Sequence, residues 1–322
     1  MKAIVYRAYG GPEVLSYEEQ PAPEPKDDQV LVRIRAASVN PYDWHFMRGS
    51  PFALRAMSGL ARPKDPRFGV DAAGIVERVG AAVTQLKPGD AVFGGCRGAL
   101  AEYACAAAAS LAIKPENVTF EQAATIPIAG QTALQGLRNI GKIQRGHRVL
   151  VNGASGGVGT FAVQIAKSFG AEVTGVCSTR NVDLVRSIGA DRVVDYTRED
   201  FTARGERYDI ILDCYVNRPL RAYVRALTNA GSYVLVGGPG RGPLGPLGAA
   251  LGAVAIKPFV KPHVATMLTK SAQADLALIG GLIAAGTITP VIDRRHPLRD
   301  SAEAIRYLED GHPRGKVVID VT

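Results

Sequence analysis

Cysteine is scarce in this chain, and its four cysteines are spread without CxxC spacing, at Cys96, Cys105, Cys177 and Cys214. This spacing indicates neither a disulfide framework nor a zinc knuckle. The five histidines form no HxH or HxxxH pair, so no metal site is predicted. Reduced thiols are the default inside cells, and the chain begins with a strand-like segment rather than a signal peptide, so we expect a cytoplasmic protein.

Long apolar runs are also missing. No stretch reaches the roughly 18 apolar residues of a membrane span, so none is expected. The net charge of +8 comes from 38 basic and 30 acidic residues, and the basic ones are scattered rather than gathered into a stripe. Nucleic acid is therefore not expected as a partner, because steering of an anionic cofactor is enough to explain the surplus charge.

Glycine is abundant, with 36 residues in a chain of 322, which is long enough for two domains. Residues 1–122 carry short strand-like runs between prolines and glycines, which indicate an irregular barrel. Residues 123–290 alternate strands with helices, as in a doubly wound parallel sheet, and residues 291–322 return to the first domain. We predict an α/β fold with cofactor and substrate meeting in the cleft between the domains.

The strand at residues 148–152 runs into a glycine-rich turn and then a helix. Ala154 stands where GxGxxG has its first glycine, which leaves Gly156 and Gly159. Small residues let backbone amides approach a pyrophosphate, and the helix directs its positive end at it. The alternative is a tight turn without a ligand. The residues predicted to hold the cofactor here are Ala154, Ser155, Gly156, Gly157 and Val158.

The next strand, at residues 171–177, ends in Ser178, Thr179, Arg180 and Asn181 rather than in an acid. Hydroxyls and a guanidinium suit a 2′-phosphate, and no carboxylate at this tip repels it. Ser178 and Arg180 therefore favour NADPH over NADH. The alternative is that Ser178 caps a helix beginning near Asn181 and that Arg180 is solvated.

Two irregular segments remain open to interpretation. Residues 241–270 are rich in glycine, proline and leucine, and form either a lid over the site or part of a subunit interface. Residues 51–66, with several arginines, either line the substrate entrance or form a solvated loop.

Seven segments together resemble the medium-chain dehydrogenase/reductase superfamily, in its zinc-independent, quinone oxidoreductase-like branch. These are residues 2–5, 40–43, 69–76, 87–92, 130–133, the glycine turn and 315–318. The resemblance implies a GroES-like β-rich catalytic domain around a Rossmann domain, with NADPH as hydride donor. It also implies a small apolar acceptor and a homodimer joined edge to edge through the Rossmann sheets.

The resemblance also assigns roles to single residues. Thr132 contacts the nicotinamide region, Tyr196 helps to hold the 2′-phosphate, and Asn40 and Asp43 shape the pocket floor. Tyr42 is the candidate proton donor, with a tyrosine packed at the domain joint as the alternative. Further expected cofactor contacts are Gly237 and Gly238, in the turn at residues 237–240, and Arg314 and Lys316 near the C-terminus.

Zinc-dependent relatives place a cysteine near Asn40 and Gly-His-Glu where this chain has Gly69-Val70-Asp71. Neither ligand is present, so we expect hydride reduction of quinones or α,β-unsaturated carbonyls without a metal. An enoyl thioester reductase is an alternative, although Pro51 and Phe52 stand near its expected catalytic tyrosine. An NADPH-binding sensor or interaction protein is a second alternative, and a zinc alcohol dehydrogenase that lost one lobe is a third.

Overall fold

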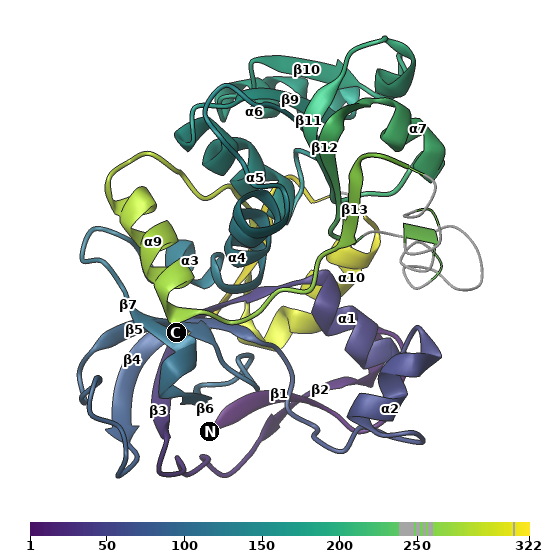
Figure 1. Cartoon of the computed structure of the whole chain (residues 1–322). Coiled ribbons are helices and arrows are strands. Elements are labelled where there is room, and N and C mark those ends of the chain that lie inside the picture. Colours follow the sequence, from purple (N-terminus) through teal and green to yellow (C-terminus); the bar gives the residue numbers. More distant parts are fainter. Residues whose placement is uncertain (238–247, 249–251, 254–255, 257–259, 312) are drawn as a thin grey trace. The chain divides into compact units, whose positions relative to one another are not determined.

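The computed structural model describes residues 1–237, 248, 252–253, 256, 260–311 and 313–322, which fold into two compact units (Figure 1). Unit 1 comprises Met1–Gln131, Lys270–Gly286 and Pro290–Thr322, and unit 2 comprises Thr132–Thr269 and Thr287–Thr289. These bounds differ from the predicted domains 1–122, 123–290 and 291–322. The reason is packing, because α3 (Phe120–Ala124) lies on β3 and β4, and α9 (Gln273–Ala284) lies on β7.

Unit 1 is built on a seven-stranded, mostly antiparallel sheet with the order β14-β15-β3-β4-β5-β7. The seventh strand, β6, pairs with residues 29–33 of β3, the part of β3 that β15 does not pair with. A separate antiparallel pair, β1 with β2, packs beside it. The predicted GroES-like β-rich fold is confirmed. The strands are β1 (Lys2–Tyr6), β2 (Leu15–Glu19), β3 (Gln29–Val39), β4 (Asp71–Val79), β5 (Ala91–Gly95), β6 (Tyr103–Ala107), β7 (Leu111–Ile113), β14 (Ile292–Pro297) and β15 (Lys316–Asp320).

Two helices of unit 1 were not expected from the sequence. Residues 40–43, predicted as a turn, begin α1 (Pro41–Arg48), which has proline in its first turn and ends at Gly49 with φ of +59°. The second is α10 (Ser301–Glu309), whose buried face of Ala304, Ile305 and Leu308 joins the unit 1 core. A third, short helix, α2 (Arg55–Ser58), follows α1.

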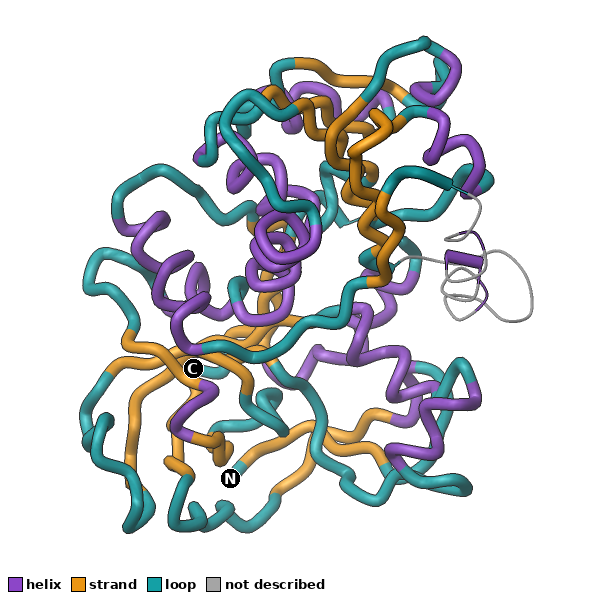
Figure 2. Tube along the Cα trace, viewed as in Figure 1, coloured by secondary structure: helices purple, strands orange, loops and turns teal. Residues whose placement is uncertain are grey.

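Unit 2 is a six-stranded parallel sheet with helices between its strands (Figure 2). Its order, β10-β9-β8-β11-β12-β13, reverses direction between β8 and β11, which is where doubly wound sheets bind ligands. The predicted Rossmann fold is confirmed, with β13 as an additional sixth strand. The strands are β8 (Arg148–Asn152), β9 (Glu172–Cys177), β10 (Arg192–Asp195), β11 (Tyr208–Asp213), β12 (Leu227–Leu235) and β13 (His263–Thr266).

The helices of unit 2 connect its parallel strands. α5 (Gly157–Ser168) is buried on all sides from Gly159 to Ala166, a mostly apolar stretch in which the buried Gln164 donates to the Thr160 and Thr289 oxygens. Further helices among the described residues are α4 (Pro127–Gln135), which begins in unit 1, the π-helical turn η4 (Gly136–Ile140), α6 (Val182–Ser187) and α7 (Leu220–Arg225). Single 3₁₀ turns are η1 (Pro12–Val14), η2 (Phe52–Leu54), η3 (Ala108–Ser110), η5 (Thr179–Asn181), η6 (Phe201–Ala203) and η8 (Leu298–Asp300). Among the described residues, no helix has the length and apolar character needed to cross a membrane.

Candidate functional site

The glycine turn joins the end of β8 to the start of α5. Gly153 has φ of +79°, a conformation that side chains other than glycine rarely adopt, and Gly156 precedes the helix as its N-cap. A Cβ on Gly159 would lie 2.1 Å from the carbonyl oxygen of Gly153. The turn therefore requires glycine at 153 and 159, and Gly153 supplies the sharp bend that the motif assigns to its first glycine.

Ala154 is compatible with this turn because its side chain points into the unit 2 core, where it is fully buried. A Cβ built on Gly175 of β9 would lie 3.1 Å from the Cβ of Ala154, so the glycine turn and β9 approach each other closely here. A Cβ on Gly156 would meet only the Gly153 oxygen, at 3.5 Å. The first-turn amides of α5, which have no intrahelical acceptor, are therefore approachable, and the turn fits a dinucleotide pyrophosphate.

Asn181 ties the glycine turn to the tip of β9. Its Nδ2 donates to Ser155 Oγ at 2.9 Å and to Ser178 Oγ at 3.3 Å. Its Oδ1 is buried and has no partner in the described part of the chain. Ser178 is the N-cap of η5, but its hydroxyl makes no capping bond, so beyond the bond that it accepts from Asn181 it can still donate at the rim. The sequence pointed to Asn181 only through its place at the strand tip.

The rim carries a carboxylate that the sequence pattern did not reveal. Asp195 ends β10, in register with Cys177, and accepts bonds from the hydroxyls of Thr179 at 2.6 Å and Thr197 at 2.7 Å. Burial acts to raise the pKa of Asp195, but these hydrogen bonds hold it below its usual range. The acid is ionised, and the Thr179 hydroxyl that was expected to face a phosphate is committed to it.

Tyr196 follows β10 directly and lies beside the end of β9, because its backbone N–H donates to the Cys177 oxygen at 3.1 Å. Its side chain is 39% exposed. Parallel strands β9 and β10 thus bring Ser178, Arg180 and Tyr196 together at the carboxyl ends of the strands, next to the glycine turn. This is the arrangement expected of a rim that binds the adenosine end of a cofactor.

The residues predicted for the nicotinamide half lie elsewhere in unit 2. Thr132 is buried in α4, and its hydroxyl shares a hydrogen bond with the hydroxyl of Thr269. Gly237 follows β12, and a Cβ there would meet nothing within 4 Å. Gly238 lies outside the described residues, as does most of the segment 241–260. The roles of Thr132, Gly237 and Gly238 stay predictions.

A buried polar network lies where the strand order of unit 2 reverses. Asn152, at the end of β8, donates from Nδ2 to Asp213 Oδ1 at 2.8 Å, and the Tyr233 hydroxyl donates to Asp213 Oδ2 at 2.6 Å. Burial raises the pKa of Asp213, and these bonds oppose the shift. The network fixes the ends of β8 and β11 beneath the glycine turn, although the sequence patterns had not singled out these residues.

Unit 1 brings three predicted residues together around an acid. Asn40 donates from Nδ2 to Asp71 Oδ2 at 2.9 Å, and the ammonium of Lys316 donates to Asn40 Oδ1. Lys316 Nζ also lies 3.6 Å from Asp71 Oδ2. Asp43 accepts the Asn40 backbone N–H at 2.7 Å. Both ends of the Asn40 amide are therefore engaged within unit 1.

All four of these side chains are buried. Burial, followed by the charge of Asp71, raises the pKa of Asp43 to about 7. Burial also raises the pKa of Asp71, against the pull of Lys316, and it lowers the pKa of Lys316. Asp71 thus serves as the buried counter-charge of Lys316. The ammonium of Lys316 is engaged inside unit 1. Its expected contact with the cofactor stays a prediction.

Tyr42 and Arg314 stay closer to the surface of unit 1. The Tyr42 side chain is 46% exposed, and its ring packs on Phe46 with 4.4 Å between centroids. Burial, followed by the charge of Asp43, raises the pKa of Tyr42, so the phenol keeps its proton at neutral pH. Arg314 is exposed, and its backbone N–H donates to Asp293 Oδ2 at 2.8 Å.

Known proteins match the chain along its length. The alcohol dehydrogenase GroES-like domain matches residues 26–116, and the zinc-binding dehydrogenase family matches residues 188–319. The NADPH-dependent alkenal/one oxidoreductase of Arabidopsis thaliana chloroplasts is 34% identical over 334 residues, which cover 99% of this chain and 79% of that protein. The chain is a medium-chain dehydrogenase/reductase. It belongs to the zinc-independent, quinone oxidoreductase-like branch of that superfamily, as the resemblance predicted.

Two solved structures share this architecture. The quinone oxidoreductase from Coxiella burnetii is 31% identical with a TM-score of 0.88, and covers 100% of this chain and 99% of its own. The Escherichia coli quinone oxidoreductase complexed with NADPH is 26% identical with a TM-score of 0.86, and the match covers 100% of both chains.

In the described part of this medium-chain dehydrogenase/reductase, no three His, Cys, Asp or Glu side chains are grouped as metal ligands. Its four cysteines are free thiols, and Asp71, which the resemblance sets opposite the last residue of Gly-His-Glu in zinc enzymes, is paired with Lys316. The side chains near Asn40 therefore hold each other rather than offering a metal site.

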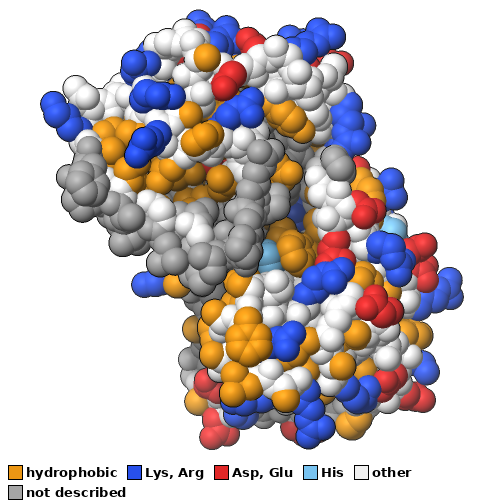
Figure 3. All heavy atoms as spheres, turned by 90° about the vertical axis from the view of Figure 1, so that its right-hand side faces the viewer, with side chains coloured by type: hydrophobic (Ala, Val, Ile, Leu, Met, Phe, Trp, Pro, Cys, Tyr) orange, Lys and Arg blue, Asp and Glu red, His pale blue; other side chains and the backbone are white. Residues whose placement is uncertain are grey.

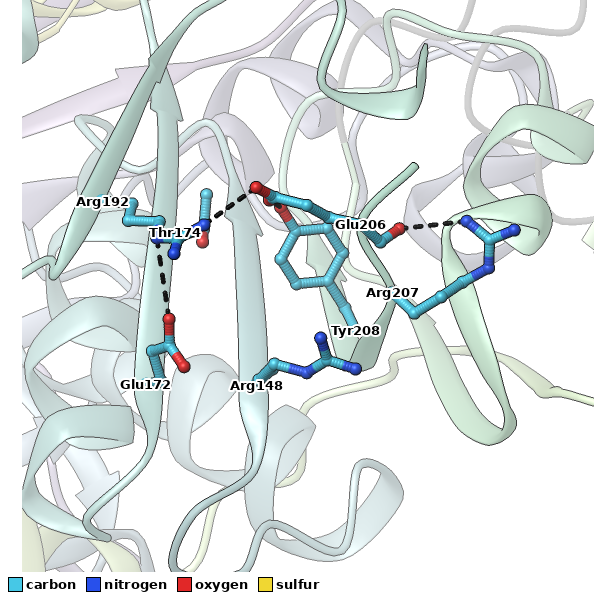
Figure 4. A pocket seen from close by; sticks show the side chains of 7 residues that line it. All are labelled: Arg148, Glu172, Thr174, Arg192, Glu206, Arg207 and Tyr208. Carbon is cyan, nitrogen blue, oxygen red and sulfur yellow. Dashed lines mark hydrogen bonds and ion pairs between the residues drawn. The ribbon is translucent and has the colours of Figure 1, made fainter. Parts of the chain in front are cut away.

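A cavity of about 140 Å³ opens at the amino ends of the unit 2 strands (Figure 4). Arg148, Glu172, Arg192 and Tyr208, which line it, are the first residues of β8, β9, β10 and β11. Arg192 pairs with Glu172 at 3.7 Å and with Glu206 at 2.8 Å. The glycine turn lies at the carboxyl ends of the same strands, so this cavity is separate from the dinucleotide site.

Proposed function

We propose that this protein is an NADPH-dependent, zinc-independent reductase that transfers hydride to quinones or α,β-unsaturated carbonyls. The observation that carries the proposal is the glycine turn, which opens α5 beside the rim of Ser178, Arg180 and Tyr196. Relatives named as an NADPH-dependent alkenal/one oxidoreductase and as a quinone oxidoreductase support it. The bound nicotinamide supplies the hydride, and the protein supplies orientation and a dry pocket.

The preference for NADPH rests on the charge of the rim. Arg180 brings a guanidinium to the tip of β9, and the nearby carboxylate of Asp195 is covered by hydroxyls and lies 3.7 Å from Arg198 Nε. A 2′-phosphate therefore meets cationic groups and a shielded acid. The 2′-hydroxyl of NADH would find no free acidic acceptor at the tip of β9.

Proton delivery distinguishes the two acceptor classes. Tyr42, the predicted proton donor, has a half-exposed phenol, whereas Asn40 and Asp43 are engaged inside unit 1. A reduced quinone can take its protons from solvent, whereas an enone gains from a positioned donor. We expect Tyr42→Phe to lower kcat for an enone and to leave quinone reduction nearly unchanged.

Stopped-flow oxidation of NADPH and NADH, with a simple quinone and a simple enone as acceptors, tests the proposal. Turnover of either acceptor with a strong preference for NADPH is expected. Saturable NADPH binding without turnover of any acceptor in a broad panel would instead favour the NADPH-binding sensor, and no binding at all would overturn both.

We also propose a homodimer and a cytoplasmic location. The resemblance places the dimer contact at the edge of the Rossmann sheet, where β13 is the last strand in the described order. Four unpaired thiols are the form that a reducing compartment maintains. Light scattering on the purified protein and fractionation of cells expressing a tagged chain test these two points.

A further inference from the structure

Three large apolar side chains project from a short segment of unit 1. Phe52, Met57 and Leu60 are 67%, 76% and 66% exposed, and among the described large apolar residues only Leu268, at 83%, is more exposed. Exposed alanines lie between or directly after them, at positions 53, 56 and 61. Isolated exposed apolar residues need no explanation, but three within nine residues form a patch.

The segment holds a defined shape. The Tyr9 hydroxyl lies 2.7 Å from Ser58 Oγ and donates to the Gly59 oxygen at 2.5 Å. The Lys64 backbone N–H donates to the Ser58 oxygen at 2.8 Å. These contacts bury Ser58 and Gly59, so the apolar side chains on either side of them point outward from an anchored backbone.

The charge of this region has one sign. No Asp or Glu occurs between Asp43 and Asp65, whereas arginines and a lysine occur at 48, 55, 62 and 64, of which Arg48 is paired with Glu309. Arg62 and Lys64 are exposed, and no described acid forms an ion pair with either of them. The next acid, Asp65, is shared by Arg67 at 2.6 Å and Arg97 at 2.8 Å, so it adds no free negative charge.

We propose that this surface, formed by Phe52, Met57, Leu60, Arg62 and Lys64, binds the surface of an anionic lipid bilayer. The apolar side chains would enter the boundary between headgroups and acyl chains, while the two cations meet lipid phosphates. Figure 3 faces the side of unit 1 that carries α2, and there hydrophobic and basic side chains lie next to one another.

A lipid surface fits these features better than a folded partner does. A stable protein interface buries about 800 Å² on each side around a continuous packed apolar core. Here three large apolar side chains lie on two one-turn helices, η2 and α2, and the loop after them, with cations beside them. A small apolar patch with a basic border suits a soft, negatively charged surface. If the proposed function holds, attachment places the enzyme where apolar quinones partition, although the lipid contact does not depend on it.

Co-sedimentation of the full chain with phosphatidylcholine vesicles, with and without phosphatidylglycerol, tests the proposal. We expect binding to the anionic vesicles, weak binding to the neutral ones, and release at high salt. The combined change Phe52→Ser, Met57→Ser and Leu60→Ser and the combined change Arg62→Glu and Lys64→Glu should each lower partitioning about tenfold. Leu268→Ser, which removes an even more exposed apolar side chain from unit 2, should leave partitioning unchanged.

NADPH binding measured by calorimetry should be unaffected in all of these variants, which shows that they fold and separates this test from that of the proposed function. The proposal is overturned if the wild-type chain does not bind anionic vesicles, or if the variants bind as well as it does. It is also overturned if the serine variant changes the mass seen by light scattering, because the surface would then join two copies of the chain.

Discussion

Two carboxylates and one ammonium lie together in the interior of unit 1, where each charge depends on the others. Lys316 Nζ is 3.6 Å from Asp71 and also donates to Asn40, which in turn donates to Asp71. Removing one partner of a buried ion pair leaves an uncompensated charge, which costs about 3–5 kcal/mol. We therefore expect Lys316→Met to lower the free energy of unfolding by that amount in a denaturant titration.

A matched control is Lys87→Met. Lys87 pairs with Asp90 at 2.8 Å, but its side chain is 81% exposed, so its loss should cost less than about 1 kcal/mol. Equal losses in the two variants would show that the Lys316 contacts contribute no more than a surface pair.

Asp43 predicts a dependence of stability on pH. Burial and the charge of Asp71 raise the pKa of Asp43 to about 7, whereas an unfolded aspartate has a pKa of about 3.9. The folded state therefore binds the extra proton between these values, and its stability falls as pH rises through them, by at most about 1.4 kcal/mol per pH unit. In Asp43→Asn this fall should be missing, as unfolding titrations at pH 5, 6 and 7 will show. Parallel curves for the two proteins would rule out this titration.

Arg180 is expected to carry much of the preference for the phosphorylated cofactor. A charge-assisted bond to a phosphate contributes roughly 1–3 kcal/mol, so Arg180→Met should raise KM for NADPH by about tenfold to a hundredfold. KM for NADH should stay the same, since it lacks the 2′-phosphate. If both values of KM change equally, Arg180 does not contact that phosphate.

At the residue scale, the sequence predicted the positions that lie in recognisable motifs and left out their partners. Asn40, Asp43 and the glycine turn belong to local patterns. Asp195 did not stand out, and Asp71 was noted only for its place opposite the Gly-His-Glu of zinc enzymes, because the importance of both depends on which strands are neighbours. Thr179 meets Asp195 only because β9 and β10 pair in register, and Asp71 meets Lys316 across more than 240 positions of sequence.

At the scale of single elements, the junction of β8 with α5 is the most constrained. Gly159→Ala would place a methyl group 2.1 Å from the Gly153 oxygen and 2.8 Å from Ala154 Cα, which are both backbone atoms. Such overpacking costs about 1–3 kcal/mol and would distort the cradle, so Kd for NADPH should rise by roughly tenfold or more.

The control for this change is Gly281→Ala in α9, where a Cβ meets nothing within 4 Å. Alanine there should stabilise the protein by about 0.5–1 kcal/mol, because glycine is a poor helix former. Calorimetry of NADPH binding and thermal melting of both variants test the pair. Unchanged affinity in Gly159→Ala would mean that the turn does not hold the cofactor.

Prediction of helices and strands succeeded where the sequence has a regular period and failed where the element is short. The strands of the Rossmann sheet at Val149, Val173, Val193, Ile210 and Val234 follow from the alternation of strand and helix. The four residues of β13 lie in a segment rich in glycine and proline, so the sequence pattern does not indicate a strand there. The strand forms by pairing with its neighbour β12. The start of α1 reads as a turn because Asn-Pro favours both a turn and a helix start.

For the whole molecule, we expect a reaction that uses no metal. The predicted chemistry needs a hydride and a proton but no Lewis acid, and Asn40 and Asp71, which the resemblance places in the segments that carry zinc ligands in zinc enzymes, bond to each other. Dialysis against a strong chelator should therefore leave quinone reduction unchanged, with metal analysis of the dialysed protein as the control. Loss of activity that returns with added zinc would contradict this prediction.

The proposed function depends above all on the glycine turn and the neighbouring rim, which should bind NADPH in preference to NADH. Isothermal titration calorimetry of the purified chain with each cofactor, at the same ionic strength, measures this preference without any acceptor. We expect NADPH to bind at least about tenfold more tightly, corresponding to roughly 1.4 kcal/mol from the extra phosphate. Equal affinity for the two cofactors would contradict the proposed role of the rim.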